Sequence, residues 1–275
     1  MLSSQRNILR SSAFSMTSNS TNNLPVTLFG ERLISNGLSV VTPMYNEEGG
    51  AASLIVEINK ALVTMVDVET EIIVVDDGST DETRAELHKI REDGVNVRII
   101  AHGTNAGQSR AIRSGVLGAK YDLIAMIDGD GQNDPVDIPA MYALLREGDF
   151  EMAMVAGERK KRLDRSSKRI ASKFANTIRQ KLLNDGARDS GCGLKLFRRE
   201  AFLRLPYFDH LHRYLPFMMQ REGLKVSFYP VHHRARSHGS SKYTNMGRLV
   251  VAFRDLAGVM WLKSRAKSPK SIIEE

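Results

Sequence analysis

Four short apolar segments alternate with segments of helical periodicity, and this alternation restricts the fold more than any other feature of the chain. The apolar segments, rich in β-branched residues, are 38–42, 71–75, 95–100 and 123–127. The segments that separate them, with apolar residues at helical spacing, are 51–66, 83–91 and 108–118. Ser79 and Glu82 have capping-box spacing before the second of these helices. Repeated strand–helix units predict an α/β fold, with a mostly parallel, Rossmann-like sheet flanked by helices.

Acidic side chains follow three of the four expected strands directly. The clusters are 43–48, 76–81 and 128–133. An Asp-Gly pair alone is ordinary turn chemistry. However, the carboxyl ends of parallel strands meet at one edge of a sheet, and ligands bind there in folds of this class. We therefore expect the three clusters to converge on one site.

The third cluster has the pattern of a divalent metal site. Asp128, Asp130 and Gln132 alternate, and all three offer the oxygen ligands that Mg²⁺ or Mn²⁺ prefers. An EF-hand calcium loop is excluded, because Asn133 and Pro139 occupy its required Gly and Glu positions. The chain also lacks P-loop and dinucleotide-binding glycine motifs. A carboxylate-held Mg²⁺ without a P-loop favours a nucleotide-diphosphate substrate.

The charge balance favours anionic partners. The 275 residues include 39 Lys and Arg against 32 Asp and Glu, a net charge of +7. A nucleic-acid-binding module is disfavoured, because the chain lacks interleaved aromatic residues and a recognisable recognition helix, and the acidic edge would repel phosphate. The single cysteine excludes an internal disulfide and predicts a reducing compartment.

An ordered set of motifs spans most of the chain. It comprises residues 41–48, 74–81, 105–107, 128–132, Arg159, 189–198 and 236–243. Together these motifs resemble family 2 glycosyltransferases of the GT-A fold, and among them the polyprenyl-phosphate sugar synthases of the dolichol-phosphate mannosyltransferase type. The resemblance covers about residues 38–261. It implies a metal-dependent, inverting transfer of a sugar from a nucleotide-diphosphate donor.

The resemblance also assigns donor-site residues. It implies that the nucleotide sugar binds to Pro43, Tyr45, Glu47, Val75, Asp77, Asp128, Gly129 and Arg159. Asp130 would act as a catalytic residue, and Asp128, Asp130 and Gln132 would hold Mg²⁺ or Mn²⁺. Both a uridine-diphosphate sugar and a guanosine-diphosphate sugar stay open as donors.

A polyprenyl phosphate acceptor requires cations more than it requires a base. A phosphate monoester is already anionic at neutral pH, because its second pKa is about 6. By analogy with this family, the residues expected to bind the acceptor phosphate are Lys195, Arg198, Arg236 and Lys242. Asp189, a second catalytic candidate, would then orient the acceptor or hold Lys195 or Arg198. In the alternative, the acceptor is a saccharide or lipid hydroxyl and Asp189 is the general base.

The two ends of the chain differ from the segment between them. We expect residues 1–37 to form a disordered leader, 38–245 the glycosyltransferase domain, and 246–275 a C-terminal helix with a basic tail. A transit peptide and an internal start at Met16 are alternatives for the leader.

Residues 249–262 are apolar but too short to span a membrane, and Arg254 and Asp255 interrupt them. With Trp261 and a basic flank, this amphipathic helix either lies at a membrane interface or packs on the core. We expect peripheral association with the cytoplasmic face of the membrane.

Overall fold

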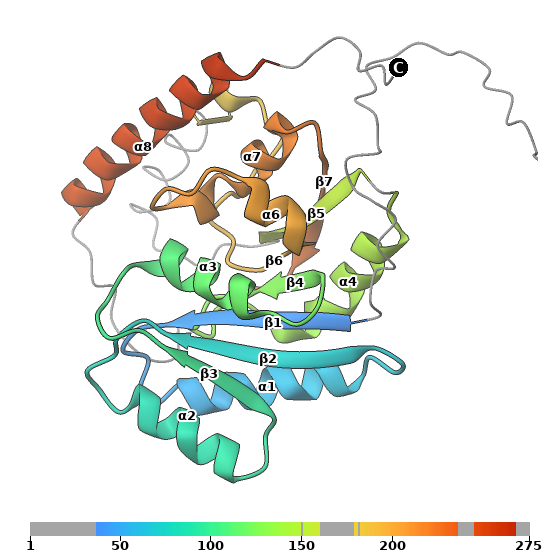
Figure 1. The fold of residues 1–275 in the computed structure, drawn as a ribbon, viewed down its shortest axis with the longest axis vertical. Coiled ribbons are helices and arrows are strands. Elements are labelled where there is room, and N and C mark those ends of the chain that lie inside the picture. Colours follow the sequence, from blue (N-terminus) through green and yellow to red (C-terminus); the bar gives the residue numbers. More distant parts are fainter. Residues whose placement is uncertain (1–36, 150, 160–178, 181, 236–244, 268–275) are drawn as a thin grey trace, which may run out of the picture.

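The computed structural model describes residues 37–149, 151–159, 179–180, 182–235 and 245–267. Its centre is one seven-stranded sheet (Figure 1). The strands are β1 (Gly37–Met44), β2 (Glu69–Asp76), β3 (Val97–Ala101), β4 (Leu123–Met126), β5 (Met152–Arg159), β6 (Lys195–Arg198) and β7 (Lys225–Val231). Their order across the sheet is β3-β2-β1-β4-β6-β5-β7. All four predicted strands are therefore present, and they form one continuous half of this sheet.

The sheet is parallel except for one strand. β1 pairs in parallel with β2 and β4, β2 with β3, and β5 with β7, whereas β6 runs antiparallel to both β4 and β5. This confirms the predicted mostly parallel sheet. Because β6 is reversed, its first residue, Lys195, lies at the edge where the parallel strands end, and its last residue, Arg198, lies at the opposite edge.

Helices cover both faces of the sheet (Figure 1). They are α1 (Ala51–Val63), α2 (Thr83–Glu92), α3 (Gln108–Gly118), α4 (Ile138–Glu147), α6 (Arg199–Arg204), α7 (Leu215–Arg221) and α8 (Asn245–Arg265), with the 3-10 turns η2 (Pro135–Asp137) and η3 (Leu211–Arg213). One apolar core packs β-sheet side chains against α1, α2 and α4, and the other against α3, α6, α7 and α8. Successive strand residues such as Ile72 and Ile73 enter different cores, because side chains alternate between the two faces of a strand.

Two local predictions were wrong in detail. Helix α1 ends at Val63 rather than Val66, since the hydroxyl and the amide of Thr64 both donate to the carbonyl of Ala61. The capping box does not form: no side chain caps α2, and the Ser79 hydroxyl instead accepts a hydrogen bond from the Asn46 amide at 3.0 Å. Ser79 therefore joins two loops at the carboxyl edge of the sheet.

Helix α8 has one face on the core and one face outward. Val259 is buried, and Leu256 and Met260 pack on the same core, as the packing interpretation predicts. On the outer face, the exposed fractions of Phe253 and Trp261 are 53% and 59%. Within the described ranges, none of the helices has both the length and the apolar character needed to cross a bilayer.

Candidate functional site

The two carboxylates of the third acidic cluster lie just beyond the end of β4. Asp128 accepts a hydrogen bond from the Gln108 side-chain amide at 2.7 Å, so the first residue of α3 orients it. Asp130 accepts one from the Gln132 backbone amide at 3.1 Å. Burial, together with the nearby charge of Asp130, raises the pKa of Asp128 to about 6. The site thus disfavours two negative charges unless a cation is present.

Two glycines allow neighbouring segments to approach these carboxylates closely. A Cβ at Gly129 would lie 2.6 Å from the carbonyl oxygen of Pro43, so the loop after β4 lies directly against the end of β1. A Cβ at Gly193 would lie 2.2 Å from the Asp128 carboxylate. Any other residue at 193 would displace that carboxylate, which places the 189–193 turn against the site.

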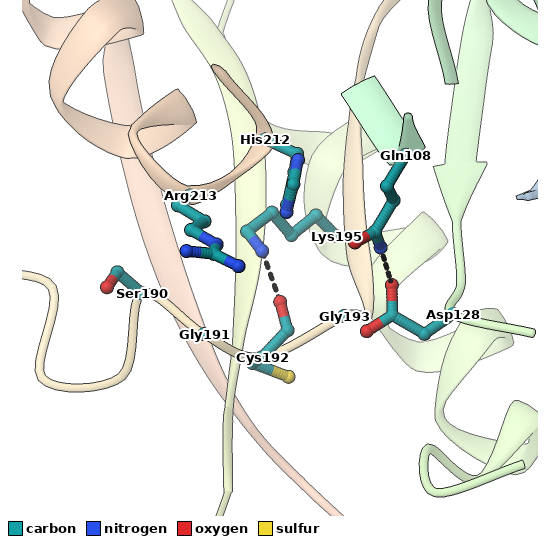
Figure 2. A pocket seen from close by; sticks show the side chains of 9 residues that line it. All are labelled: Gln108, Asp128, Ser190, Gly191, Cys192, Gly193, Lys195, His212 and Arg213. Atoms are coloured by element: carbon teal, nitrogen blue, oxygen red, sulfur yellow. Dashed lines mark hydrogen bonds between the residues drawn. The ribbon is translucent and has the colours of Figure 1, made fainter. Parts of the chain in front are cut away.

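A cavity of about 160 Å³ adjoins Asp128 (Figure 2). Its lining consists of Gln108, Asp128, Ser190, Gly191, Cys192, Gly193, Lys195, His212 and Arg213. Lys195 is only 1% exposed, and its ammonium group donates to the carbonyl of Cys192. Burial lowers the pKa of Lys195, whereas the charge of Asp128 opposes that shift. The cavity therefore brings one carboxylate together with two cationic side chains.

Asp189 forms a bidentate ion pair with Arg159 beside this cavity. The Arg159 Nε and Nη2 atoms lie 2.5 and 2.7 Å from the two carboxylate oxygens, and both side chains are about nine-tenths buried. The sequence predicts Lys195 or Arg198 as the partner of this carboxylate, but in the structure its ion-pair partner is Arg159. Arg159, at the end of β5, lies on the same edge of the sheet, which explains the pairing.

Arg198 lies outside this site. It pairs with Leu123 at the start of β4, and its guanidinium donates to the carbonyls of Met152 and Asp149. The prediction that it binds the acceptor phosphate fails, because the reversed direction of β6 places it at the far edge of the sheet.

The first two acidic clusters lie at the same edge but have structural partners. The carboxylate of Asp76 accepts from the Ser79 amide and from Arg84. That of Asp77 accepts from the amides of Ala106 and Gly107, at 3.0 and 2.8 Å. Asp77 therefore shapes the 105–107 loop just before α3.

Within the described residues, His, Cys, Asp and Glu form no group of three or more that could hold a metal ion.

The predicted nucleotide-binding residues of β1 and β2 separate into two groups. The Glu47 amide donates to the Thr83 hydroxyl at 2.8 Å, so the loop that contains Tyr45 and Glu47 is fixed against the start of α2. Tyr45 and Glu47 are partly exposed at this edge. Val75, in contrast, is fully buried in the core that packs on α3, so its side chain cannot line the predicted base pocket.

Two predicted phosphate-binding residues, Arg236 and Lys242, lie outside the described residues. The segment that precedes them reaches the 128–133 loop: the Arg234 amide donates to the carbonyl of Gln132 at 2.8 Å, and Asn133 forms a β-bridge with His233.

Three cavity residues were absent from the sequence-based prediction. Gln108 directly follows the 105–107 motif, and its position there could have indicated that it belongs to the site. His212 and Arg213 lie in η3, and no motif in the sequence indicated that this turn belongs to the site. The His212 Nδ1 atom lies 2.8 Å from the Ser109 hydroxyl, and burial lowers the pKa of His212 well below its usual value. His212 is therefore neutral at neutral pH.

The chain matches a family model and several named proteins over more than half of its length. Residues 39–205 match the family model described as glycosyl transferase family 2. Over 228 residues, 82% of the chain, it is 34% identical to dodecaprenyl-phosphate galacturonate synthase of Rhizobium johnstonii. Over 220 residues, 80% of the chain, it is 32% identical to undecaprenyl-phosphate 4-deoxy-4-formamido-L-arabinose transferase of an Enterobacter species. The chain spans 66% of the length of each relative, just under two thirds.

Solved structures share the fold at lower sequence identity. Glucosyl-3-phosphoglycerate synthase of Mycobacterium tuberculosis, in complex with phosphoglyceric acid, has a TM-score of 0.63 at 19% identity, covering 84% of this chain and 81% of the other. The same enzyme has a TM-score of 0.62 at 18% identity in its complex with Mn²⁺, uridine-diphosphate-glucose and glycerol 3-phosphate, with the same coverage of both chains. The predicted GT-A fold is thereby confirmed.

Proposed function

The chain belongs to glycosyl transferase family 2, and on that premise we propose that it transfers a sugar from a nucleotide-diphosphate donor to a polyprenyl phosphate. The observation that supports this most directly is the cavity that Asp128 lines together with two cationic side chains, Lys195 and Arg213. The two relatives described above are named for transfer to polyprenyl phosphates, which supports the same acceptor class.

The residues at the end of β4 fit a divalent cation. The raised pKa of Asp128 reflects burial beside a second carboxylate, and a cation would relieve that repulsion. Mg²⁺ is usually held by one or two protein carboxylates together with substrate phosphates, so a third carboxylate is not required. Asp128, Asp130 and the side chain of Gln132 would hold Mg²⁺ or Mn²⁺. When bound, the ion stabilises the negative charge that develops on the departing nucleotide diphosphate.

The donor nucleotide would lie along the ends of β1 and β2. The side chains of Tyr45 and Glu47 would form the pocket for the base and ribose, with the Tyr45 ring packing on the base. Pro43 is buried at the end of β1, so it would contribute its backbone rather than its ring. Asp77 would act mainly through the 105–107 loop that it holds. Uridine- and guanosine-diphosphate sugars both fit this proposal.

The ion pair of Asp189 favours a phosphate acceptor over a hydroxyl acceptor. A general base must accept a proton from its substrate within hydrogen-bond reach. Both oxygens of Asp189 already contact the Arg159 guanidinium. A phosphate monoester needs no such base, since it is already anionic. Asp189 would then position Arg159 beside the phosphates, and Arg236 and Lys242 would contribute further positive charge.

Helix α8 would attach the protein to the membrane that contains the acceptor. Phe253 and Trp261 expose apolar surface, and Arg254 and Arg265 are exposed beside them. Aromatic side chains together with basic residues favour binding at an anionic membrane interface. We place this attachment at the cytoplasmic face.

A transfer assay tests the proposal. Radiolabelled uridine- and guanosine-diphosphate sugars are incubated with Mn²⁺ or Mg²⁺ and either a short polyprenyl phosphate or the matching polyprenol. We expect label in the polyprenyl phosphate product only, and no transfer after chelation of the metal. Transfer to the polyprenol alone would refute the phosphate acceptor and favour Asp189 as a general base.

A further inference from the structure

We infer that His212 and Arg213 of η3 bind the phosphate group of the acceptor, together with Lys195, on the side of the cavity opposite Asp128. This inference rests on the proposed function and assigns two residues that the family motifs do not include. Figure 2 shows Arg213 and Asp128 at opposite ends of the cavity, with the Lys195 side chain between them.

Arg213 supplies a cation that faces the cavity. Its guanidinium points into the cavity (Figure 2). Among the described residues, this guanidinium has no hydrogen bond or ion pair. This distinguishes it from the neighbouring Arg159, which is neutralised by Asp189. A partly enclosed arginine without a counter-ion is suited to bidentate binding of phosphate oxygens.

His212 is held in place by α3. The Ser109 hydroxyl lies 2.8 Å from Nδ1, and both residues are buried. The other ring nitrogen, Nε2, has no hydrogen-bond partner among the described residues. When the Ser109 hydroxyl donates to Nδ1, the single proton of the neutral ring lies on Nε2, which becomes a donor to an anion. Ser109 is therefore a positioning residue for His212.

The position of these groups favours the acceptor phosphate over the donor diphosphate. The donor would contact the metal-site loop through Asp128 and Asp130, at the end of β4. Lys195 and η3 line the cavity next to Asp128, where a second anion could approach the donor. Two anions in one site repel each other, and the cations Lys195 and Arg213 would offset that repulsion. The neutral imidazole of His212 adds a donor without adding charge.

The test compares Michaelis constants for the two substrates. Arg213→Gln should raise the KM for a short polyprenyl phosphate roughly tenfold or more, the usual effect of losing a hydrogen bond to a charged group. The donor KM should stay within about twofold of the unaltered value. Arg213→Lys should recover part of the loss. Ser109→Ala should raise the acceptor KM less, about threefold, because it frees the ring without removing it. The control is Lys60→Gln, which removes an exposed positive charge on α1.

Binding of inorganic phosphate gives a second readout that does not depend on transfer. Calorimetry should show weaker phosphate binding to Arg213→Gln than to the unaltered protein or to Lys60→Gln. Equal phosphate binding by all three proteins, or a rise confined to the donor KM, would overturn the inference. If the unaltered protein transfers no sugar to polyprenyl phosphate but Arg213→Gln still weakens phosphate binding, the proposed function fails while the anion site stands.

Discussion

The Asp189–Arg159 ion pair offers a direct test of what Asp189 does. The ion pair is bidentate and both of its side chains are about nine-tenths buried. Removing one partner therefore leaves an uncompensated charge inside the protein. Breaking such a buried pair typically costs about 3–5 kcal/mol. For a domain of this size, 1 kcal/mol shifts Tm by roughly 2–4 °C, so Asp189→Leu should lower Tm by about 6–20 °C.

A double-mutant cycle separates the interaction energy of the ion pair from the other effects of each substitution on stability. Arg159→Met combined with Asp189→Leu should be much less destabilising than the two single changes added together, since neither charge is then left alone. The matched control is the more exposed pair between Arg234 and Glu57, where Glu57→Gln should cost under about 1 kcal/mol. Tm and denaturant unfolding provide the measurements.

The outcome that would refute this reasoning is specific. A general base contributes about 10²–10⁴-fold to the rate. If Asp189→Asn lowered kcat by that factor while Tm stayed unchanged and the cycle showed no coupling, Asp189 would be a base. The hydroxyl-acceptor alternative would then be preferred.

Three further predictions concern the metal site and the membrane surface. Asp130→Asn should abolish metal-dependent transfer with little change in Tm, because the residue lies in a loop outside both cores; retained activity would contradict its role as a ligand. Gly193→Ala should reduce metal affinity and transfer together, since its Cβ would lie 2.2 Å from the neighbouring Asp128 carboxylate, whereas Gly258→Ala, with no atom within 4 Å, serves as the tolerated control. Replacing Phe253 and Trp261 with Ser should weaken sedimentation with anionic vesicles but leave transfer to a soluble short-chain acceptor intact; unchanged sedimentation would argue that the outer face of α8 does not contact lipid.

Local sequence patterns predicted the elements well because periodicity is a local property. Helix α3 was expected at residues 108–118 and spans Gln108–Gly118. The strands at 38–42 and 71–75 were each found within longer strands, β1 and β2. Among the predicted elements, the errors occurred at ends, as at Val66, where side-chain hydrogen bonds rather than periodicity decide where a helix stops; β5, β6 and β7 were not predicted.

The sequence predicts a candidate site most readily where its residues are close together. Asp128, Asp130 and Gln132 lie within five residues, so their spacing alone predicts a metal site, and that stays a prediction. The clusters at 76–81 and 128–133 were expected to share a function, yet Asp76 bonds to Ser79 and Arg84, and Asp77 bonds to the amides of the 105–107 loop. Residue type does not reveal whether a carboxylate's hydrogen bonds are already taken by nearby amides.

By itself, the amino-acid sequence determined the α/β class, the parallel strands and the loop with two carboxylates, because each depends on contiguous residues. Only the tertiary structure decided which cations join that loop. Reversal of β6 brings Lys195 to the site and removes Arg198, and a contact across 103 residues brings His212 onto Ser109. Such pairings depend on strand direction and on packing between distant segments, and no local pattern encodes either.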